Sequence, residues 1–470
     1  MRHVTAWILL ATLLHVAPPL GAAPLPRIRI APDGRSFVDA RGRPFVPFGV
    51  NYFRPGTGWA PQVWKQFDPE ATRRDFERLR EMGANCIRVF LTHGSFAPTP
   101  DALDPVGAGR LDQLLDLVEA AGLYVHPTGL DHWEGTPSWA RGDRFADETL
   151  LRAQEEFWSR LAARLKGRSV VFAYDLLNEP TVGWTGAALE AQWNAWVGTR
   201  FASAAEAATA WGVPQADIPW GRVPPPPPEN RPGDRRLLDY QRFRESVADD
   251  WTRRQAAAIK AADPDALVTV GLIQWSVPAL LPSVRHYSAF RPSRQAPFLD
   301  FLEIHFYPLE HGAHPYRGPE GASRNLAYLE SVVRETARPG KPVVIAEFGW
   351  YGGGSFDKQP KATEEDQADW CGSLVETTRG LAVGWLNWGL YDHPEAKDVT
   401  RLTGLLTADG REKAWGRRFR VLAAALAGKE IPAPPPAVRP ALDWDRCVTD
   451  VEAGHAFRKA YYRAFAGRGQ

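Results

Sequence analysis

The chain has 470 residues and carries 56 Lys and Arg against 55 Asp and Glu, so its formal net charge is +1. Because no excess of positive charge is available to attract polyanions, the composition disfavours binding of nucleic acid or of anionic membranes. Hydrophobic residues make up 44% of the chain and charged residues 24%, a balance that allows a sizeable core and excludes bulk disorder.

Residues 1–23 have the pattern of an export signal. Arg2 and His3 precede an apolar run at 6–16, and the small residues at 21–23 offer a cleavage site. The apolar run is too short to cross a bilayer, so we expect no membrane span after cleavage. The pattern predicts a secreted or periplasmic protein. Its three cysteines cannot all pair with one another and are expected to be buried free thiols.

The body of the chain alternates short β-branched or aromatic runs with segments of helical period, which is typical of βαβ units. The pattern predicts helices at 69–82, 111–121, 148–166, 235–263, 321–337 and 363–379. It predicts eight strands, at 45–51, 85–90, 123–128, 170–178, 266–272, 301–307, 343–347 and 383–388. No Gly-rich phosphate turn follows a strand, so we expect a (β/α)8 TIM barrel of the α/β class rather than an open doubly wound sheet.

Three additions to a minimal barrel are expected. A β-hairpin starting at residue 28 would close the bottom of the barrel domain, which spans 24–430. An insertion at 181–235 follows the fourth strand, contains five Trp and a run of prolines, and is expected beside the site at the C-terminal face. Residues 431–470 read as a proline-rich linker and a C-terminal helical tail that packs back on the barrel.

Two carboxylates are predicted at the mouth of this barrel. The fourth strand ends at Glu179 and the seventh ends at Glu347. Simple alternation puts Glu347 on the same face as Val343 and Ile345, pointing into the barrel. Cleavage of a glycosidic bond needs two carboxyl groups, one to protonate the leaving oxygen and one to attack or to activate water. The pattern therefore predicts glycoside-cleaving chemistry.

With these positions in place, the sequence resembles glycoside hydrolase clan A, and within it family 5, the cellulases and mannanases. The resemblance covers about residues 28–428 and rests on the segments FVPFGVNYF, ANCIRVF, LLNEP, EIHFYP, VVIAEFGW and GWLNWGL. It implies a TIM barrel that hydrolyses β-glycosides with retention of configuration; we expect no cofactor.

The resemblance implies roles for four residues. Glu179 would be the general acid/base and Glu347 the nucleophile of a double displacement. Arg88 matches the arginine that orients the nucleophile, and Asn178 matches the residue that bonds the sugar hydroxyl next to the reacting carbon. Negative charge on Glu347 should also disfavour ionisation of Glu179 and keep that acid protonated.

The sixth strand presents further candidates on one face. His305 and Tyr307 match the histidine and tyrosine around the nucleophile, and the Tyr307 hydroxyl is expected to donate to Glu347. Glu303 lies deeper on the same face and has no assigned role, although Arg88 is a candidate partner for it.

Aromatic and histidine side chains supply the remaining binding candidates. Trp388 matches the tryptophan that floors the subsite of the reacting sugar, whereas Trp385 is expected to pack inside the barrel. His126, at the end of the third strand, matches a substrate-binding histidine. Five tryptophans are expected in loops on the mouth side of the barrel, and each either stacks on a sugar or packs within the core or its loop. They are Trp59, Trp64, Trp184, Trp275 and Trp350.

The segment after the fourth strand departs from a compact family 5 barrel and resembles the corresponding region of family 42 β-galactosidases. It leaves open whether the cleft is an exo-acting pocket or an open groove. We expect a secreted retaining β-glycosidase with a carbohydrate substrate, a β-mannan or β-glucan first and a β-galactoside as the alternative. A non-catalytic carbohydrate-binding barrel is the competing interpretation, and no spacing of histidines indicates a metal.

Overall fold

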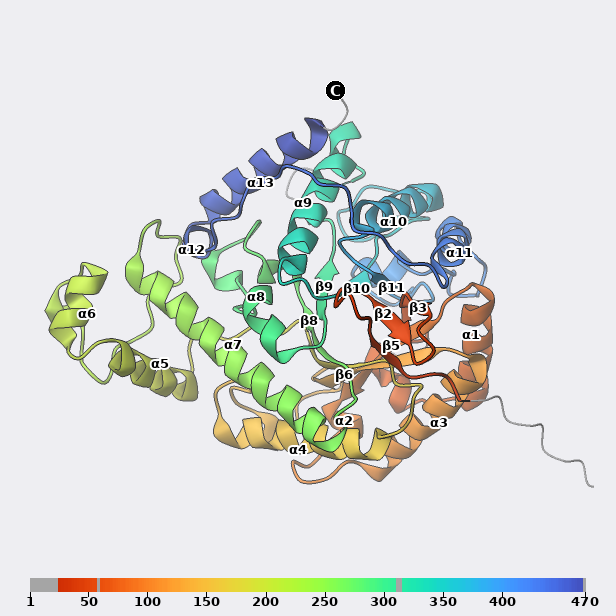
Figure 1. Ribbon diagram of the computed structural model, residues 1–470, viewed down its shortest axis with the longest axis horizontal. Helices are drawn as coiled ribbons and strands as arrows, with labels where there is room; N and C mark the ends of the chain where they lie inside the picture. The colour runs from red at the N-terminus through yellow and green to blue at the C-terminus, as the bar shows by residue number, and fades with distance from the viewer. Residues whose placement is uncertain (1–23, 57–59, 310–314, 468–470) are drawn as a thin grey trace, which may run out of the picture.

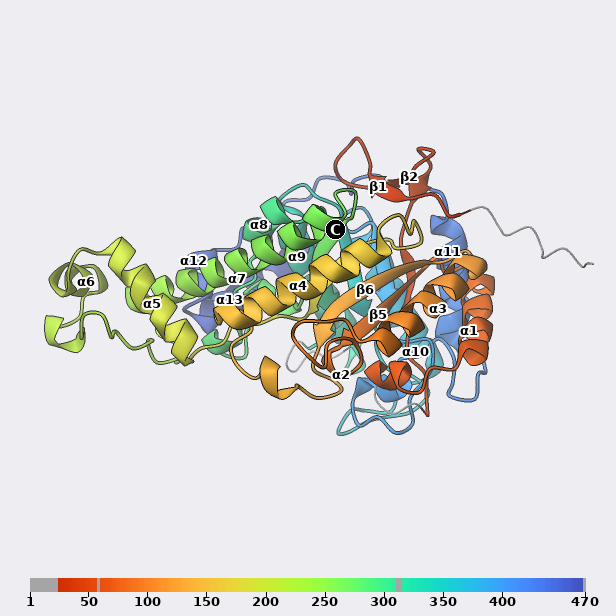
Figure 2. The ribbon, with the colours of Figure 1, turned by 90° about the horizontal axis from the view of Figure 1, so that it is seen from below.

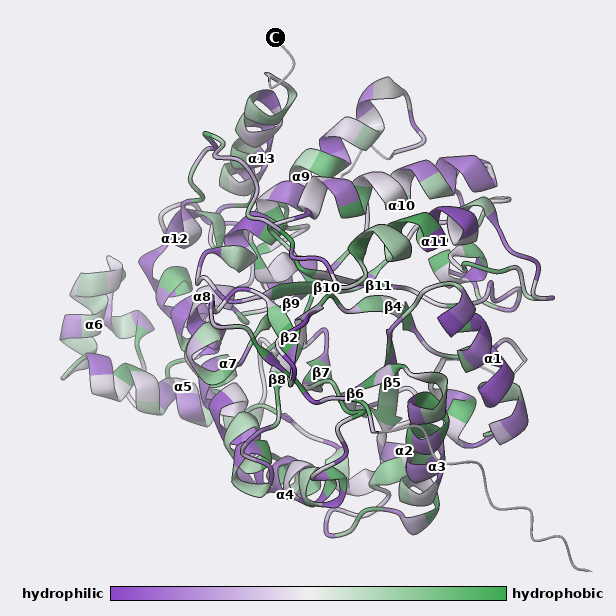
Figure 3. Cartoon of the chain, turned by 45° about the vertical axis from the view of Figure 1, so that its right-hand side comes forward, coloured by the Kyte–Doolittle hydropathy of each residue, from purple (hydrophilic) through white to green (hydrophobic). Residues whose placement is uncertain are grey.

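The computed structural model describes residues 24–56, 60–309 and 315–467, so the predicted export signal lies outside the described residues. Eight parallel strands close into a barrel in the order β10-β11-β4-β5-β6-β7-β8-β9. Figure 3 looks into this ring and shows the helices around it. The strands are β4 (Phe48–Asn51), β5 (Cys86–Thr92), β6 (Tyr124–Asp131), β7 (Tyr174–Asn178), β8 (Val268–Leu272), β9 (Leu302–Phe306), β10 (Val343–Phe348) and β11 (Gly384–Asn387).

Helices follow the strands and cover the outside of the barrel (Figure 1). Their apolar residues pack on the sheet, as in α4, where Leu151, Trp158 and Leu161 belong to the main core. The predicted helices correspond to α1 (Pro69–Glu81), α3 (Pro105–Ala121), α4 (Glu148–Leu165), α7 (Arg235–Ala262), α9 (Pro319–Ala337) and α10 (Glu364–Thr378). The chain also contains the short α2 (His93–Phe96) directly after β5, the short α8 (Pro292–Gln295) between β8 and β9, and α11 (Ala414–Leu426) after β11. The prediction of a (β/α)8 barrel is confirmed.

The bottom of the barrel is closed by a small antiparallel sheet, as expected from the N-terminal hairpin. Strands β1 (Ile28–Ile30), β2 (Phe37–Asp39) and β3 (Pro44–Phe45) form it, and it lies at one end of the barrel in Figure 2. The Phe37 ring meets Phe172 and Phe301 from the barrel interior, each with ring centroids 5.2 Å apart. This apolar plug leaves the opposite, C-terminal end of the strands as the place for polar side chains.

The insertion after β7 forms a projection rather than a wall of the cleft. Its helices α5 (Ala187–Arg200) and α6 (Ala204–Trp211) lie beyond one end of α7 in both Figure 1 and Figure 2. The Trp193 ring stacks on Trp196 and Trp211 with centroids 5.3 and 6.0 Å apart, and it also packs on Tyr240 of α7. Three of the five insertion tryptophans therefore build a local core.

The C-terminal segment returns to the barrel and packs on α9. It contains α12 (Trp444–Cys447) and α13 (Val451–Ala466), which lies beside α9 in Figure 1. Buried Glu330 on α9 accepts from Arg439 at 2.8 Å and from the Tyr461 hydroxyl at 3.0 Å. All three cysteines are buried free thiols, as expected. No helix among the described residues is long and apolar enough to cross a membrane.

Candidate active site

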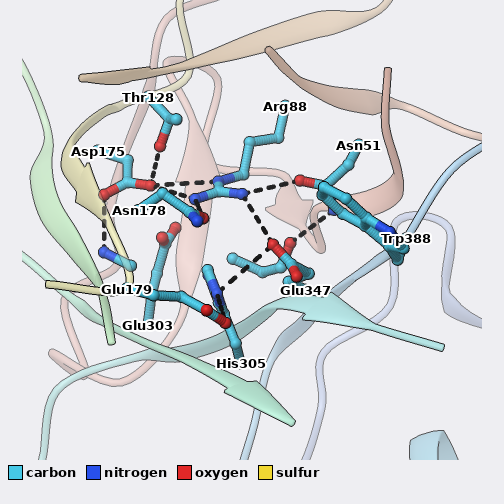
Figure 4. A network of polar contacts seen from close by, with 12 residues as sticks. Asn51, Arg88, Thr128, Asp175, Asn178, Glu179, Glu303, His305, Glu347 and Trp388 are labelled. Carbon is cyan, nitrogen blue, oxygen red and sulfur yellow. Dashed lines mark hydrogen bonds and ion pairs between the residues drawn. The ribbon is translucent and has the colours of Figure 1, made fainter. Parts of the chain in front are cut away.

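Side chains along β5 and β9 point alternately outward and into the barrel. Those that point inward are apolar at the plug and polar nearer the mouth. On β5, Ile87 and Val89 face the helices, while Cys86 packs at the bottom of the interior and Arg88 lies above it. On β9, Phe301 packs with the plug and Glu303 and His305 follow on the same face, as predicted. Figure 4 shows these interior groups converging.

A bulge brings Glu347 into this interior. Val343 and Ile345 pack in the main core outside the barrel, whereas Val344 and Ala346 pack against the plug. The expectation that Glu347 shares a face with Val343 and Ile345 is therefore wrong. The pairing of β10 with β9 shifts register between Ile345 and Glu347, and this extra residue reverses the alternation so that Glu347 still points inward.

Glu347 is held by two donors. Its Oε1 accepts from the Tyr307 hydroxyl at 2.7 Å, as predicted, and its Oε2 accepts from Arg88 Nη1 at 3.4 Å. Burial raises the pKa of Glu347 and nearby Glu179 adds to the rise, while the charge of Arg88 and the Tyr307 hydroxyl act to lower it. Both donors stabilise the carboxylate form, which is the form that can attack an electrophilic carbon.

Arg88 is fully buried and links four polar side chains. Its Nη2 and Nε donate to Asp175 Oδ2 at 2.7 and 3.2 Å, and its Nη1 donates to Asn51 Oδ1 at 2.9 Å. Its Nη2 also donates to Asn178 Oδ1 at 2.8 Å. A buried guanidinium is tolerated only when it is paired in this way. The arrangement fixes the planar group so that its remaining donor faces Glu347.

Sequence reasoning missed Asp175 and Asn51, which complete this network. Asp175 is fully buried on β7, and its second oxygen accepts from the backbone N–H of Gly271 at 2.7 Å. Thr128 also donates to it. The sequence contains a signal for Asp175, because it is a charged residue inside the otherwise apolar run of β7 and therefore requires a buried partner.

Glu179 occupies a less buried position than Glu347. Its side chain is 28% exposed against 8% for Glu347. Its backbone has φ 47°, a left-handed conformation that is uncommon outside glycine, and its N–H donates to the carbonyl of Gly271 at 2.8 Å. Burial raises the pKa of Glu179 to about 7, with Arg88 opposing the rise and Asp131 adding to it. Burial, rather than the charge of Glu347, is therefore the main cause of the raised pKa of Glu179.

His305 lies between the two carboxyl groups. Its Nδ1 is 3.1 Å from Glu179 Oε1 and 3.6 Å from Glu347 Oε2. Burial lowers the pKa of His305 to about 4, so the ring is neutral near pH 7. Since both neighbours of Nδ1 are carboxylate oxygens, the proton belongs on Nδ1 for a hydrogen bond to form. A neutral ring here can orient Glu179 without adding a positive charge that would favour its ionisation.

The two carboxyl groups lie close to one another. One oxygen of Glu179, one oxygen of Glu347 and a ring nitrogen of His305 all lie within 4.8 Å of each other. Asn178 ends β7 beside them, with its Oδ1 occupied by Arg88. The site thus combines a half-exposed acid, a buried carboxylate and an amide at the barrel mouth.

Trp388 flanks this pair in an aromatic cluster. Its ring packs against Phe53 and Phe90 with centroids 4.9 and 5.8 Å apart, and its Nε1 donates to Thr400 Oγ1 at 2.9 Å. Trp385 instead faces outward and donates to Thr378 of α10, so the expectation that it packs inside the barrel is wrong. Of these two tryptophans, Trp388 is the one in the aromatic cluster at the mouth.

His126 does not lie at the mouth, contrary to its predicted role in substrate binding. It is fully buried, and its Nδ1 contacts the carbonyl of Ala173 at 2.8 Å. Its Nε2 contacts Glu303 Oε1 at 2.5 Å, so the partner of Glu303 is His126 rather than Arg88. The reason is the length of β6, which continues to Asp131 instead of ending at residue 128.

The other tryptophan candidates mostly serve packing. Trp64, Trp184 and Trp350 are buried in the main core, whereas Trp275 is partly exposed. Trp59 lies outside the described residues. Loop packing is therefore the interpretation that holds for three of these five positions.

Two clusters have ligand types that could hold a metal ion. One is the group of Glu179, His305 and Glu347 at the mouth, and the other is the buried set of His126, Asp175 and Glu303. In the buried set the Arg88 guanidinium already bonds Asp175, and its permanent positive charge disfavours a second cation there.

Comparisons with known proteins agree with this geometry. The family model described as Cellulase (glycosyl hydrolase family 5) matches residues 38–394. Cellulase/esterase CelE of Acetivibrio thermocellus is 26% identical over 197 residues, which is 38% of this chain and 23% of that protein, so the match spans about a quarter of CelE.

Solved structures share the fold at lower identity. A GH5_18 protein from Streptomyces cattleya, in complex with Manβ1-4GlcNAc, has a TM-score of 0.63 and 21% identity over 90% of this chain and 92% of that one. An exo-β-1,4-mannosidase from Opitutaceae bacterium strain TAV5 has a TM-score of 0.59 and 21% identity, covering 84% of this chain and 62% of that one. A β-galactosidase from Halorubrum lacusprofundi has a TM-score of 0.61 and 17% identity, covering 82% and 58%.

The family match covers most of the barrel, from the second strand of the plug to the loop after β11. It includes both strand-end glutamates, Arg88 and the aromatic cluster. The chain belongs to glycosyl hydrolase family 5.

Proposed function

We propose that this protein is an exported, retaining β-glycosidase that acts on β-mannosides through Glu347 as nucleophile and Glu179 as acid/base. The observation that supports the mechanism is that one oxygen of Glu179 and one oxygen of Glu347 lie within 4.8 Å of each other, so the two carboxyl groups are close neighbours. Carboxyl groups about 5–5.5 Å apart fit direct attack, whereas about 6.5–9.5 Å is needed to place a water molecule between carboxylate and sugar.

In the first step, an oxygen of Glu347 attacks the anomeric carbon and the bond to the leaving oxygen breaks. Glu179 gives its proton to that oxygen, and its pKa of about 7 keeps it protonated on the acidic side of neutrality. In the second step, Glu179 takes a proton from water, the water oxygen attacks the same carbon, and Glu347 is released. Configuration is retained because the carbon is inverted twice.

The neighbours have separate duties. Arg88 and Tyr307 hold Glu347 by hydrogen bonds at 3.4 and 2.7 Å. Arg88 also occupies Oδ1 of Asn178, so the Nδ2 group of that amide is the part available to donate to a sugar hydroxyl. Trp388 offers an apolar ring face as the floor for the reacting sugar.

The preference for β-mannosides rests on two of the proteins that share the fold, whose names include a bound Manβ1-4GlcNAc and an exo-β-1,4-mannosidase. A β-galactoside is the second candidate, because β-galactosidases also share the fold and the insertion after β7 resembles that class. β-Glucans complete the set to be tested.

Product analysis distinguishes these substrates. The purified protein is incubated with β-mannan, β-glucan, xylan, short β-mannosides and aryl β-glycosides, with Glu347→Ala as control. Faster release of sugar from β-mannosides than from the other substrates, absent in the variant, supports the proposal. Faster turnover of aryl β-galactosides would instead make β-galactosides the substrate. Silence on the whole panel would overturn the catalytic role. Export is tested separately by sequencing the mature N-terminus, which we expect near residue 24.

A further inference from the structure

Arg244 on α7 is a fully buried positive charge that the mechanism does not use. Its hydrogen-bond acceptors among the described residues are all neutral oxygens. Its Nη2 donates to the carbonyl of Val182 and its Nε donates to the carbonyl of Gly183 at 3.1 Å. Its Nη1 donates to Gln241 Oε1 at 2.6 Å. Burial of a guanidinium without a carboxylate partner is costly, so these hydrogen bonds have to offset that cost.

The hydrogen bonds of Arg244 fix a segment of the loop after β7. Burial lowers the pKa of Arg244 to about 10, so the group is still charged near pH 7, and charged donors bond oxygen more strongly than neutral ones. The guanidinium also lies over the Trp184 ring, 5.1 Å from its centroid. Trp184 Nε1 donates to the carbonyl of Pro226 at 2.9 Å, and the Trp184 carbonyl accepts from the Tyr240 hydroxyl. Residues 182–184 are therefore tied to α7 at several points.

This segment continues directly from the strand that carries Glu179, which precedes Val182 by three residues. The backbone of Glu179 has φ 47°, a conformation that costs energy outside glycine. Such a conformation persists only where the surrounding structure holds the chain. On one side, the N–H of Glu179 donates to the carbonyl of Gly271 at 2.8 Å. On the other side, Arg244 holds the two carbonyls that follow.

Gln241 fixes the guanidinium of Arg244 in its turn. Gln241 is also fully buried, and its Nε2 donates to the carbonyls of Val284 and Val448 at 2.9 and 2.8 Å. Val284 belongs to the loop after β8, and Val448 follows α12 in the C-terminal segment. The loop after Glu179 is thus connected through α7 to two segments that are distant in the sequence.

We propose that Arg244 is a positioning residue that fixes the direction of the Glu179 carboxyl group by holding the carbonyls of Val182 and Gly183. This inference rests on the proposed role of Glu179 as acid/base. Because Arg244 is fully buried, it acts through the backbone of the loop and not on the substrate. Proton transfer needs the acid within about 2.6–3.2 Å of the leaving oxygen, so a loosened loop would leave Glu179 out of reach for part of the time.

Two aryl substrates that differ in their need for a proton test this role. Arg244→Met keeps an apolar stem and removes all the donors. We expect it to lower kcat/KM for a phenyl β-glycoside about 10- to 100-fold, which is part of the effect of a general acid. For the dinitrophenyl β-glycoside of the same sugar, kcat/KM should change by about twofold at most, because dinitrophenolate leaves without a proton. A merely structural defect would lower both values alike.

The second step provides an independent readout. With the dinitrophenyl substrate, water can release the sugar from Glu347 only with Glu179 as base, so kcat should fall in Arg244→Met. Azide ion attacks the same carbon without a base, forms the glycosyl azide and releases Glu347. Sodium azide should therefore raise kcat of the variant and leave kcat of the unmodified protein unchanged.

Two further variants complete the experiment. Arg244→Lys keeps the charge with fewer donors and should show the same selective loss at smaller size. Thermal melting verifies folding, and Arg244→Lys carries the test alone if Arg244→Met does not fold. The control Arg254→Met, further along the same helix, removes a partly buried arginine that pairs with Glu148 and should leave both substrates unaffected.

The outcomes separate this inference from the function on which it rests. Equal losses on both leaving groups, no effect of azide, or a selective loss in Arg254→Met as well would overturn the positioning role of Arg244. An unmodified protein that hydrolyses neither substrate, or a Glu179→Ala protein without selective loss on the phenyl substrate, would instead contradict the proposed function.

Discussion

Replacing Asp175 by Asn tests the buried network that positions the nucleophile. Asp175 Oδ2 accepts from Arg88 at 2.7 Å and Oδ1 accepts from the Gly271 N–H at 2.7 Å, and both charged side chains are fully buried. Asparagine has the same shape but only one acceptor oxygen. Either Arg88 or the Gly271 N–H would then face an amide N–H₂ group, donor against donor.

The expected loss of stability follows from this mismatch. Removing one partner of a buried ion pair costs about 3–5 kcal/mol, because the remaining charge stays buried without compensation. An unfolding entropy of about 2.1 cal/mol/K per residue gives about 1 kcal/mol per degree for 470 residues. The Tm should therefore fall by about 3–5 °C. The activity should fall as well, because Arg88 loses the partner that aims it at Glu347.

Melting curves and kcat/KM measured together give the answer. Asp116→Asn is a matched control, since Asp116 is 71% exposed and pairs with Arg168 on the surface. Such a pair contributes about 0–1 kcal/mol, so the control should melt nearly like the unmodified protein. An Asp175→Asn protein with unchanged Tm and unchanged kcat/KM would refute the reasoning, and a lower Tm with full activity would refute the positioning of Arg88.

Three further variants test separate parts of the site. Because the pKa of Glu179 is about 7 and only its protonated form can donate, kcat/KM should fall as the pH rises through about 7. In Glu179→Ala this fall of kcat/KM with rising pH should vanish, and the rate should drop most for substrates with poor leaving groups. A pH–rate profile of the variant that still shows the fall would argue against the acid role of Glu179. Tyr307→Phe removes a charge-assisted hydrogen bond and should lower kcat/KM about 10- to 100-fold without lowering Tm; an unchanged rate contradicts this. A Cβ at Gly271 would lie 2.9–3.1 Å from atoms of three site side chains, so Gly271→Ala should lower the activity. The control Gly109→Ala has open space around the new Cβ and should keep full activity in the same assay. Equal activity of the two variants would show that the site side chains can shift without loss of function.

Strand ends were predictable from the sequence because their residue types differ from the strands themselves. Glu179 and Glu347 stand where apolar runs stop, and a parallel barrel brings such ends together. His305 and Tyr307 followed from alternation along a regular strand. The family resemblance then assigned roles that geometry alone could not.

Two of the errors, on Glu347 and on His126, share one physical cause, which is local irregularity in the strands. The bulge before Glu347 reverses alternation, and no single residue in an apolar run announces it. The extra length of β6 places His126 one layer deeper than expected and pairs it with Glu303. Asp175 lies inside β7 rather than at its end, so a search for polar residues at strand ends does not find it.

Whether the tryptophans of the insertion bind a sugar or pack on one another could not be predicted from the sequence. A tryptophan that stacks on a sugar and one that stacks on another tryptophan have the same local pattern. Trp193 meets its ring partners through the packing of α5 and α6 on α7, which depends on contacts distant in the chain.

The stereochemistry of the first product tests the central claim most directly. Proton NMR is recorded within the first minutes of hydrolysis of an aryl β-glycoside, before the anomers of the free sugar equilibrate. If Glu347 attacks the sugar and Glu179 serves both steps, the β-anomer appears first and the α-anomer grows in later by mutarotation. Initial release of the α-anomer would show single inversion and contradict the roles assigned to the two carboxyl groups.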